Sequence, residues 1–459
     1  MHPARSAAWL IWQGPYKIDA AYLDEDELKK GSAALVTGLR TAVVAFAAAL
    51  GAGIALLYTA RTYRLTRRGQ ITDRFTKALE RLDSDEVYVR IGGILALEQI
   101  VQDAPEQAAT DAARVLGHFI RERTPKAAPP PNLDGPGNQP PSKPLPDEPA
   151  ADIQAALTAL TRTESRTHVD PREPLDLHEL HLAGAQLTEA DLTHADLRGA
   201  TLTKANMGKA MLTRVDLRGA TLTKTNLRGA RLTGADLRGA RLTGADLRGA
   251  TLTKADLGGA RLTDADLHGA TLVKANMGKA MLTAANLRGA TLVKTNLRGA
   301  TLTRADLREA TLTEAHLGEA TLTKANLTGA TLTKANLTGA TLTKANLTGA
   351  TLTKANLAET TLAEADLRGA RLAEADMTRA RLTEAHLGGA MLVQTHLTGA
   401  TLTQADLRGA TLTNANLHAA DLSRAVGLTP TQAVSAHSSK YTKWPANVAS
   451  SIRPATTEY

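Results

Sequence analysis

Basic side chains recur at intervals of twenty residues and supply the first candidates for binding chemistry. Two series of three share this spacing: Lys254, Lys274 and Lys294, and Arg198, Arg218 and Arg238. Ammonium and guanidinium groups at regular spacing suit partners that carry phosphate or carboxylate groups. We therefore predict these six residues as a candidate interaction surface.

Catalytic and metal-binding patterns are absent from the sequence. The chain contains no Cys, which removes disulfides, thiolate nucleophiles and zinc–thiolate sites. Its His residues are dispersed: His386 and His396 are ten apart, while His178 and His181 lack further ligands at metal spacing. No phosphate-binding loop, dinucleotide glycine pattern or Ser nucleophile elbow occurs. We predict no enzyme activity, no metal and no cofactor.

A five-residue repeat positions both basic series and fills residues 175–424. Every fifth residue from Leu177 to Leu422 is Leu or Met, and the residue two places earlier is nearly always Ala. Neither a helix period of 3.6 nor a strand period of 2 produces fives, so the chain must turn a corner once per unit. The departures are Met207, Met277 and Met377 at the Leu position, and Leu175, Leu180, Val215, Thr225, Thr295, Thr360 and Thr395 at the Ala position.

The units ADLRG, ANLTG and ATLTK resemble the A-[DN]-L-x-x unit of pentapeptide-repeat proteins, and fifty in-phase units carry the resemblance. It implies a mainly β fold, a right-handed quadrilateral β-helix with four units to a coil and with Leu and Ala pointing inward. Residues twenty apart would then stack, ATLTK-type and ADLRG-type units would occupy opposite pairs of faces, and the rod would hold about 12 coils. The segments RTYRLTRRGQITDRFTKALERL, GLTPTQ and KYTKW resemble the flanks of membrane-anchored members.

Residues 41–60, from Thr41 to Ala60, contain no charge and are long enough to cross a hydrocarbon core of roughly 30 Å as a helix. We predict a single transmembrane helix here; a buried helix of a soluble protein is the alternative. Five Arg follow within residues 61–74, against three basic residues in 29–40, and the richer side normally stays in the cytoplasm. The solenoid is therefore predicted to be cytoplasmic in a cell-membrane protein. Small residues four apart at Ala45, Ala49 and Gly53 would let two such helices pack closely in a homodimer, although this spacing also arises by chance in an Ala-rich span.

From Thr72 the apolar residues fall three or four apart and predict two antiparallel helices. VRIGGILALEQI resembles one HEAT or armadillo unit, although a single unit cannot build a solenoid. Thr429 before Pro430 is a helix-start signal at the end of the repeat. The predicted segments are a short N-terminal segment (1–40), the transmembrane helix (41–60), a helical membrane-proximal segment (61–124), a Pro-rich linker (125–149), a short helix and lead-in (150–174), the solenoid (175–424) and a C-terminal cap and tail (425–459).

Charge is uneven along the repeat. Residues 201–300 hold 17 Lys and Arg against 6 Asp and Glu, whereas residues 301–424 hold 12 against 12. The basic half favours either an anionic partner, nucleic acid or the inner membrane leaflet, or a solvated surface that keeps the rod soluble. No aromatic residue lies between Phe119 and Tyr441 to stack on the bases of single-stranded nucleic acid.

These patterns predict a non-enzymatic, membrane-anchored scaffold that presents the solenoid to an unknown protein partner. The alternative is a nucleic-acid-associated protein, which binds DNA through the basic half or acts on a type II topoisomerase as some pentapeptide-repeat proteins do by mimicking DNA. Mimicry requires an acidic rod, and this one is basic in one half and neutral in the other. Thr rows such as TLT at 301–303 also resemble ice-binding solenoids, but Arg or Met interrupts them and Thr has high β-propensity.

Overall fold

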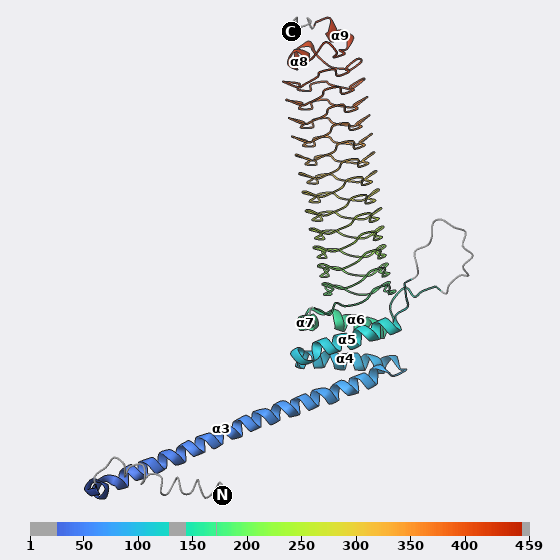
Figure 1. Cartoon of the computed structure of the whole chain (residues 1–459). Coiled ribbons are helices and arrows are strands. Elements are labelled where there is room, and N and C mark those ends of the chain that lie inside the picture. The colour runs from blue at the N-terminus through green and yellow to red at the C-terminus, as the bar shows by residue number, and fades with distance from the viewer. Residues whose placement is uncertain (1–24, 128–143, 171, 452–459) are drawn as a thin grey trace. The chain divides into compact units, whose positions relative to one another are not determined.

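The computed structural model describes residues 25–127, 144–170 and 172–451. The chain divides into two compact units, residues 1–77 and 78–459. Within the described residues, Figure 1 shows the long helix α3 (Glu25–Leu82), a group of shorter helices, and a tall stack of coils that ends in α8 and α9. The last residues of α3 belong to the second unit.

Helix α3 contains the apolar segment of the sequence. Ala, Leu and other good helix formers dominate it, and it runs unbroken through Gly51 and Gly53. Its part Arg40–Leu82 is long and apolar enough to cross a membrane, and none of its most apolar window is buried in protein. The span predicted over 41–60 thus lies inside a longer helix. That helix also includes Thr72, where the sequence pattern indicated a separate soluble helix.

A helical collar follows, made of α4 (Val87–Asp103), α5 (Pro105–Arg123), α6 (Ala151–Thr161) and α7 (Thr163–Arg166). Helices α4, α5 and α6 pack on one another around Leu97, Ile120 and Leu157, which are completely or almost completely buried. The sequence predicted a pair of antiparallel helices before the Pro-rich segment. Helix α6 is the short helix predicted within residues 150–174, and the structure adds its packing on α4 and α5, whose apolar stripes leave a face that Leu157 and its neighbours cover.

One buried ion pair joins α6 to α4. Arg90 Nε lies 2.7 Å from Asp152 Oδ2, and both side chains are nearly inaccessible to solvent. Arg90 Nη1 also donates to the backbone carbonyls of Ser84 and Asp85, at 2.9 and 2.7 Å. A single guanidinium therefore ties the turn before α4 to the start of α6.

The Pro-rich segment is bonded to the first coil at both ends. The Ala127 N–H donates to the Glu179 carbonyl at 2.7 Å, and the His181 N–H donates to the Pro125 carbonyl at 2.8 Å. At the other end, His181 Nε2 lies 2.8 Å from the Pro146 carbonyl. The predicted linker, 125–149, is thus shorter at each end, and its residues 128–143 lie outside the described part of the chain.

Parallel bridges between residues twenty apart build the coils. Around the bridge of Asp236 with Asp256, the Leu237 N–H donates to the Asp256 carbonyl at 2.6 Å and the Asp256 N–H donates to the Ala235 carbonyl at 2.9 Å. Twenty residues per turn make four units per coil and four faces, with the two unit types alternating as predicted. In the described coils, each bridge pairs a single residue with one residue of the next coil. Strands of greater length do not form there, because each unit turns its corner after one bridging residue. The bridges are those of a β-helical solenoid, and the prediction of a mainly β class is not confirmed, because no extended strand forms among the described residues.

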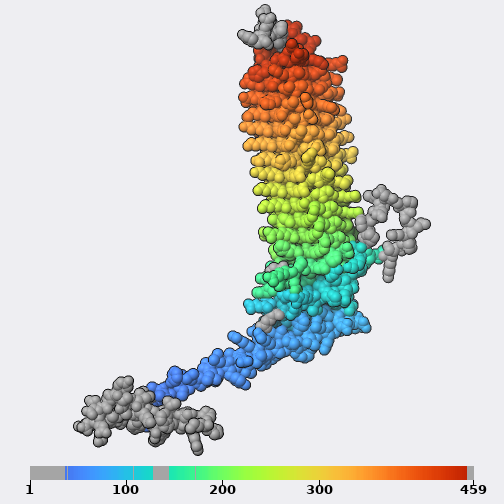
Figure 2. Space-filling view, in the orientation of Figure 1, coloured from blue at the N-terminus to red at the C-terminus, as the bar shows by residue number. Residues whose placement is uncertain are grey.

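Leu and Ala fill the interior of the rod. Leu237 and Leu337 are completely buried, and Figure 2 shows the coils stacked along the visible face. Each Leu removed from water contributes on the order of 1.5 to 3 kcal/mol, which offsets much of the entropy cost of ordering the units. The Thr residues at Ala positions are buried without leaving a polar group unpaired: Thr225 Oγ1, for example, donates to the Leu202 carbonyl at 2.6 Å.

The fifth residue of each unit, Gly in ADLRG and Lys in ATLTK, takes a left-handed backbone conformation to turn the corner. This position alternates largely between Gly and a charged residue, and φ is 58° at Lys254 and 64° at Gly249. A side chain at such a φ costs roughly 1–2 kcal/mol relative to the ordinary regions. Lys254, Lys274 and Lys294 adopt this left-handed conformation at their corners, and their side chains are exposed there.

A C-terminal cap closes the stack. Helix α8 (Pro430–Val434) begins at the predicted start signal, with Thr429 and Gln432 forming a reciprocal capping box. Gln432 Nε2 also donates to the carbonyls of Leu407 and Ala410 in the last full coils, at 3.2 and 2.7 Å. The short helix α9 (Ala446–Ala449) follows. Open backbone groups at the end of the rod are thus partly satisfied by the cap.

Candidate interaction surface

The six predicted basic residues lie on two adjoining faces of the rod. The lysine face consists of residues 211–215, 231–235, 251–255, 271–275 and 291–295, and the arginine face consists of residues 196–200, 216–220 and 236–240. The bridges of Thr251 with Thr271 and of Asp216 with Asp236 stack the units of each face. The structure therefore brings the three Lys into one column and the three Arg into another.

The arginine face is a ladder of ion pairs. Arg198, Arg218 and Arg238 each place Nη2 2.6 Å from the Asp two residues earlier in the same unit. Each Nε also lies 3.6 to 3.9 Å from the Asp of the following coil. The register places a carboxylate on either side of every guanidinium, so this column is neutralised by its own neighbours.

These pairs shift the acidity of the carboxylates. The Arg238 guanidinium, through its hydrogen bonds, holds the pKa of Asp236 below the ordinary value, and Arg198 does the same to the pKa of Asp196. Partial burial opposes the shift at both sites but is outweighed. The same cause lowers the pKa of Asp246, Asp306, Asp366 and Asp406.

We expect the rod to lose stability in acid through these carboxylates. A pKa lower in the folded than in the unfolded chain stabilises the fold above the unfolded value, about 3.9 for Asp, and this contribution disappears as pH falls through the folded pKa. Because the pairs are largely solvated, each contributes at most about 1 kcal/mol. Melting temperatures measured by circular dichroism from pH 6 to pH 2 should fall below about pH 4.

The Asp236→Asn variant should show a smaller acid loss than the parent chain. Asp264→Asn is the matched control, since Asp264 is exposed and has no ion pair among the described residues. An acid profile that is the same in both variants would contradict the assignment of the effect to the ladder.

The lysine face differs because its cations are not neutralised. Lys254 and Lys274 are exposed, and no carboxylate of the described residues lies within ion-pair distance of either. Lys294 Nζ lies 3.4 Å from Glu314 Oε2, the first acidic group further along this face. The six candidates thus separate into three Arg that are fully paired and two Lys that are free, with Lys294 between these cases.

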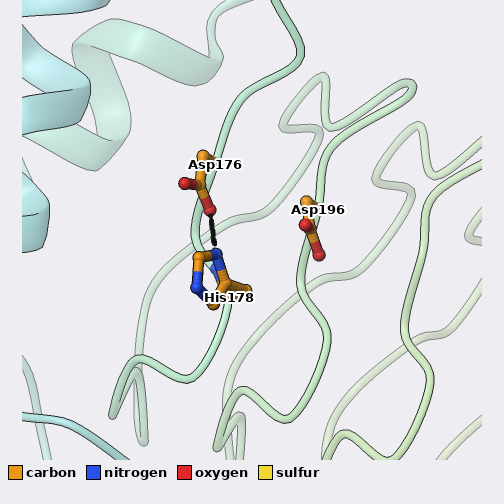
Figure 3. A group of neighbouring side chains, drawn as sticks. All are labelled: Asp176, His178 and Asp196. Atoms are coloured by element: carbon orange, nitrogen blue, oxygen red, sulfur yellow. Dashed lines mark hydrogen bonds and ion pairs between the residues drawn. The ribbon is translucent and has the colours of Figure 1, made fainter.

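Asp176, His178 and Asp196 form the one group with metal-ligand proximity in the described part of the chain (Figure 3). Their ligand atoms lie within 4.8 Å of one another, and His178 Nδ1 is 2.5 Å from Asp176 Oδ1. Guanidiniums already occupy both carboxylates: Arg121 Nη1 is 2.8 Å from Asp176, and Arg198 binds Asp196. A cation would have to displace these pairs, so we assign no metal site.

Arg121 is a residue that the sequence did not single out. It extends from α5 to the first coil and contacts both Asp176 and His178, and Arg114 on the same helix pairs with Glu173. These contacts join the collar to the beginning of the rod. Their partners lie more than fifty positions away, and no local pattern marks them.

The described coils form a solenoid with four faces, a Leu and Ala interior and charged side chains outside, which is the architecture of a repeat protein. A model of pentapeptide repeats matches eight copies, at residues 181–219, 210–249, 240–278, 280–318, 320–358, 350–389, 360–399 and 390–426. The chain belongs to the pentapeptide-repeat family. Membership implies a right-handed β-helical solenoid.

Solved structures of pentapeptide-repeat proteins resemble the chain in part. HetL of the cyanobacterium Nostoc sp. strain PCC 7120, involved in heterocyst differentiation regulation, is 36% identical over 50% of this chain and 89% of its own, with a TM-score of 0.23. QnrB1, a plasmid-mediated fluoroquinolone resistance protein, is 19% identical over 48% of this chain and 90% of its own, with a TM-score of 0.32. A thylakoid-lumen protein of Arabidopsis thaliana is 30% identical over 26% and 70%, with a TM-score of 0.17. No curated protein matches the chain.

Proposed function

We propose that the chain is a non-enzymatic, membrane-anchored scaffold that presents its solenoid in the cytoplasm to a protein partner. The observation that carries the anchoring is the apolar window of α3, none of which is buried in protein. The solenoid supports the scaffold role, because its Leu and Ala interior is dry and its chemically varied groups all face outward. The excess of Arg after residue 60 supports the cytoplasmic orientation.

The anchor is tested by extraction from membranes. The full chain should remain in the membrane pellet after washing with alkaline carbonate, and deletion of residues 41–60 should release it to the supernatant. Retention of the deleted chain would contradict a span in this segment.

The orientation is tested with single thiols, because the chain has no Cys of its own. Tyr441 is exposed in the C-terminal cap, so Tyr441→Cys supplies a reactive group on the rod side. A membrane-impermeant maleimide should label it only after sealed cells are opened, whereas Ser32→Cys, before the span, should be labelled in sealed cells. The reverse pattern would place the rod outside.

The scaffold role is tested by crosslinking in the intact membrane. Photo-crosslinkers at exposed positions of the rod should capture a discrete protein, and the same reagents in a chain lacking residues 175–424 should not. Capture of nucleic acid in place of protein would support the alternative function.

The alternative function, association with nucleic acid, has two forms: mimicry of DNA, and binding of DNA through the basic half. The second has more support than the first. DNA mimicry needs an acidic surface, but the Asp column on the arginine face is bound by Arg198, Arg218 and Arg238. DNA binding through the basic half is favoured by the free cations of the lysine face. It predicts retention of duplex DNA by the full chain that falls steeply between about 50 and 200 mM salt.

A further inference from the structure

Of the four faces of the basic half, the lysine face carries the largest net positive charge. Between residues 211 and 295 this face carries five cations and no carboxylate. Arg214, Arg231, Lys254 and Lys274 are exposed, and within the described chain none of them lies within 4.0 Å of an acidic group. Lys294, the fifth cation, pairs only with Glu314 at the far end of the row.

The other three faces of residues 201–300 are interrupted by acidic groups. On the arginine face, Arg218 and Arg238 are bound by Asp, and Arg298 is bound by Glu319. On the opposite Thr face, made of residues 201–205, 221–225, 241–245, 261–265 and 281–285, Lys204 lies 3.9 Å from Asp147 and Asp264 breaks the row. On the remaining face, Arg248 is bound to Asp246 at 2.5 Å. Unpaired cations also occur on these faces, such as Lys224 and Arg261 on the opposite Thr face, but the lysine face is the one that holds no carboxylate between residues 201 and 300.

The cations of the lysine face are spaced for an extended anionic partner. Successive coils lie roughly 4.8 Å apart, so Lys254, Lys274 and Lys294 stand close enough to repel one another unless anions approach. Thr253 and Val273, which precede Lys254 and Lys274, are half-buried. A flat row of cations matches a planar array of headgroups better than it matches one small anion.

We propose that the lysine face docks on an anionic membrane surface. The chain carries its own apolar helix, and this inference rests on the proposed anchoring, which would keep the rod near the membrane and let individually weak contacts add. Single-stranded nucleic acid is a poorer fit, since no aromatic residue lies between Phe119 and Tyr441 to stack on bases.

The test uses the full chain in symmetric vesicles, so that either orientation meets the same headgroups. Thr253→Cys on the lysine face or Thr263→Cys on the opposite Thr face carries an environment-sensitive fluorophore. The vesicles contain a nitroxide headgroup quencher in phosphatidylcholine, with or without about 30% phosphatidylserine. Quenching at position 253 should be at least twofold greater with phosphatidylserine and should fall to the phosphatidylcholine level in high salt. Position 263 should show no such difference.

Matched charge variants identify the cations responsible. Lys254→Gln with Lys274→Gln should abolish the phosphatidylserine-dependent quenching at position 253. Lys224→Gln with Arg261→Gln removes the same charge from the opposite Thr face, where both side chains are exposed, and should leave the quenching intact. Equal quenching in the two lipids, or equal loss in both double variants, would overturn the proposal.

Flotation separates failure of docking from failure of the anchor. Flotation with phosphatidylcholine vesicles reports the anchor alone. If the chain floats with both lipids but position 253 shows no lipid dependence, docking is wrong and anchoring stands. If it floats only with phosphatidylserine, and Lys254→Gln with Lys274→Gln stops this, anchoring is wrong and docking stands. Salt-sensitive binding of duplex DNA, lost in the same double variant without any lipid preference, would assign the face to nucleic acid instead.

Discussion

Replacing Leu337 by Asp is expected to break the solenoid in its middle and to cost at least about 4 kcal/mol of unfolding free energy. Leu337 is completely buried, and its neighbours in the coil and in the coils above and below are Leu and Ala. A carboxylate at this point has no cation or donor to pair with, because the backbone groups around it are already used in the bridges.

The damage should be local at first. Each coil contacts only the coils next to it, so a rod interrupted at one coil can keep its two arms folded. Limited proteolysis of the variant should therefore cut near residue 337 and leave fragments that resist further digestion, while thermal melting by circular dichroism shows a lower and broader transition.

Two variants separate burial of charge from loss of volume. Leu337→Ala removes packing without adding charge and should cost about 2–5 kcal/mol without a preferred cleavage site. Lys334→Gln changes an exposed residue of the preceding unit and should alter stability by less than about 0.5 kcal/mol. If Leu337→Asp resists protease as well as Lys334→Gln does, the interior at this coil is not dry, and the account of the core fails.

The architecture of the coil could be predicted from the sequence, because the repeat is strictly periodic. An unbroken period of five fixes which residue of each unit is buried, and a resemblance to pentapeptide repeats supplied the four-unit coil that stacks Lys254 on Lys274. The number of residues that each unit pairs with the next coil could not be deduced from the sequence in the same way. A spacing of 4.8 Å is common to long strands and single bridges, and only the backbone geometry at the corners limits each pairing to one residue.

The structure showed that the column of Arg is paired with Asp whereas Lys254 and Lys274 are not paired. The residues responsible for this difference can be seen in the sequence. Reading the sequence at intervals of twenty shows an Asp two places before Arg198, Arg218 and Arg238, and no acidic residue on the lysine face from 211 to 295. What no spacing predicts is the reach of Arg121 from α5 to Asp176 or the packing of α6 on α4. Those contacts join segments far apart along the chain and depend on how the collar folds.

Breaking the buried ion pair between Arg90 and Asp152 is expected to destabilise the helical collar strongly. Removing one partner leaves the other charge buried without compensation, which typically costs about 3–5 kcal/mol. We therefore expect Asp152→Ala to destabilise the packing of α4 with α6 by this amount. Hydrogen exchange measured by mass spectrometry should show faster exchange in peptides from both helices, while the coils beyond residue 200 keep their protection.

The double variant Arg90→Met with Asp152→Ala should recover a large part of the loss, because it removes both buried charges together. Recovery should be incomplete, since the carbonyls of Ser84 and Asp85 lose the donor that Arg90 Nη1 provides. Asp111→Ala is the matched control: it breaks the exposed pair of Asp111 with Arg114 and should cost no more than about 1 kcal/mol. If Asp152→Ala costs no more than Asp111→Ala, the Arg90 pair does not hold the collar together, and the packing of α6 must depend on its apolar face alone.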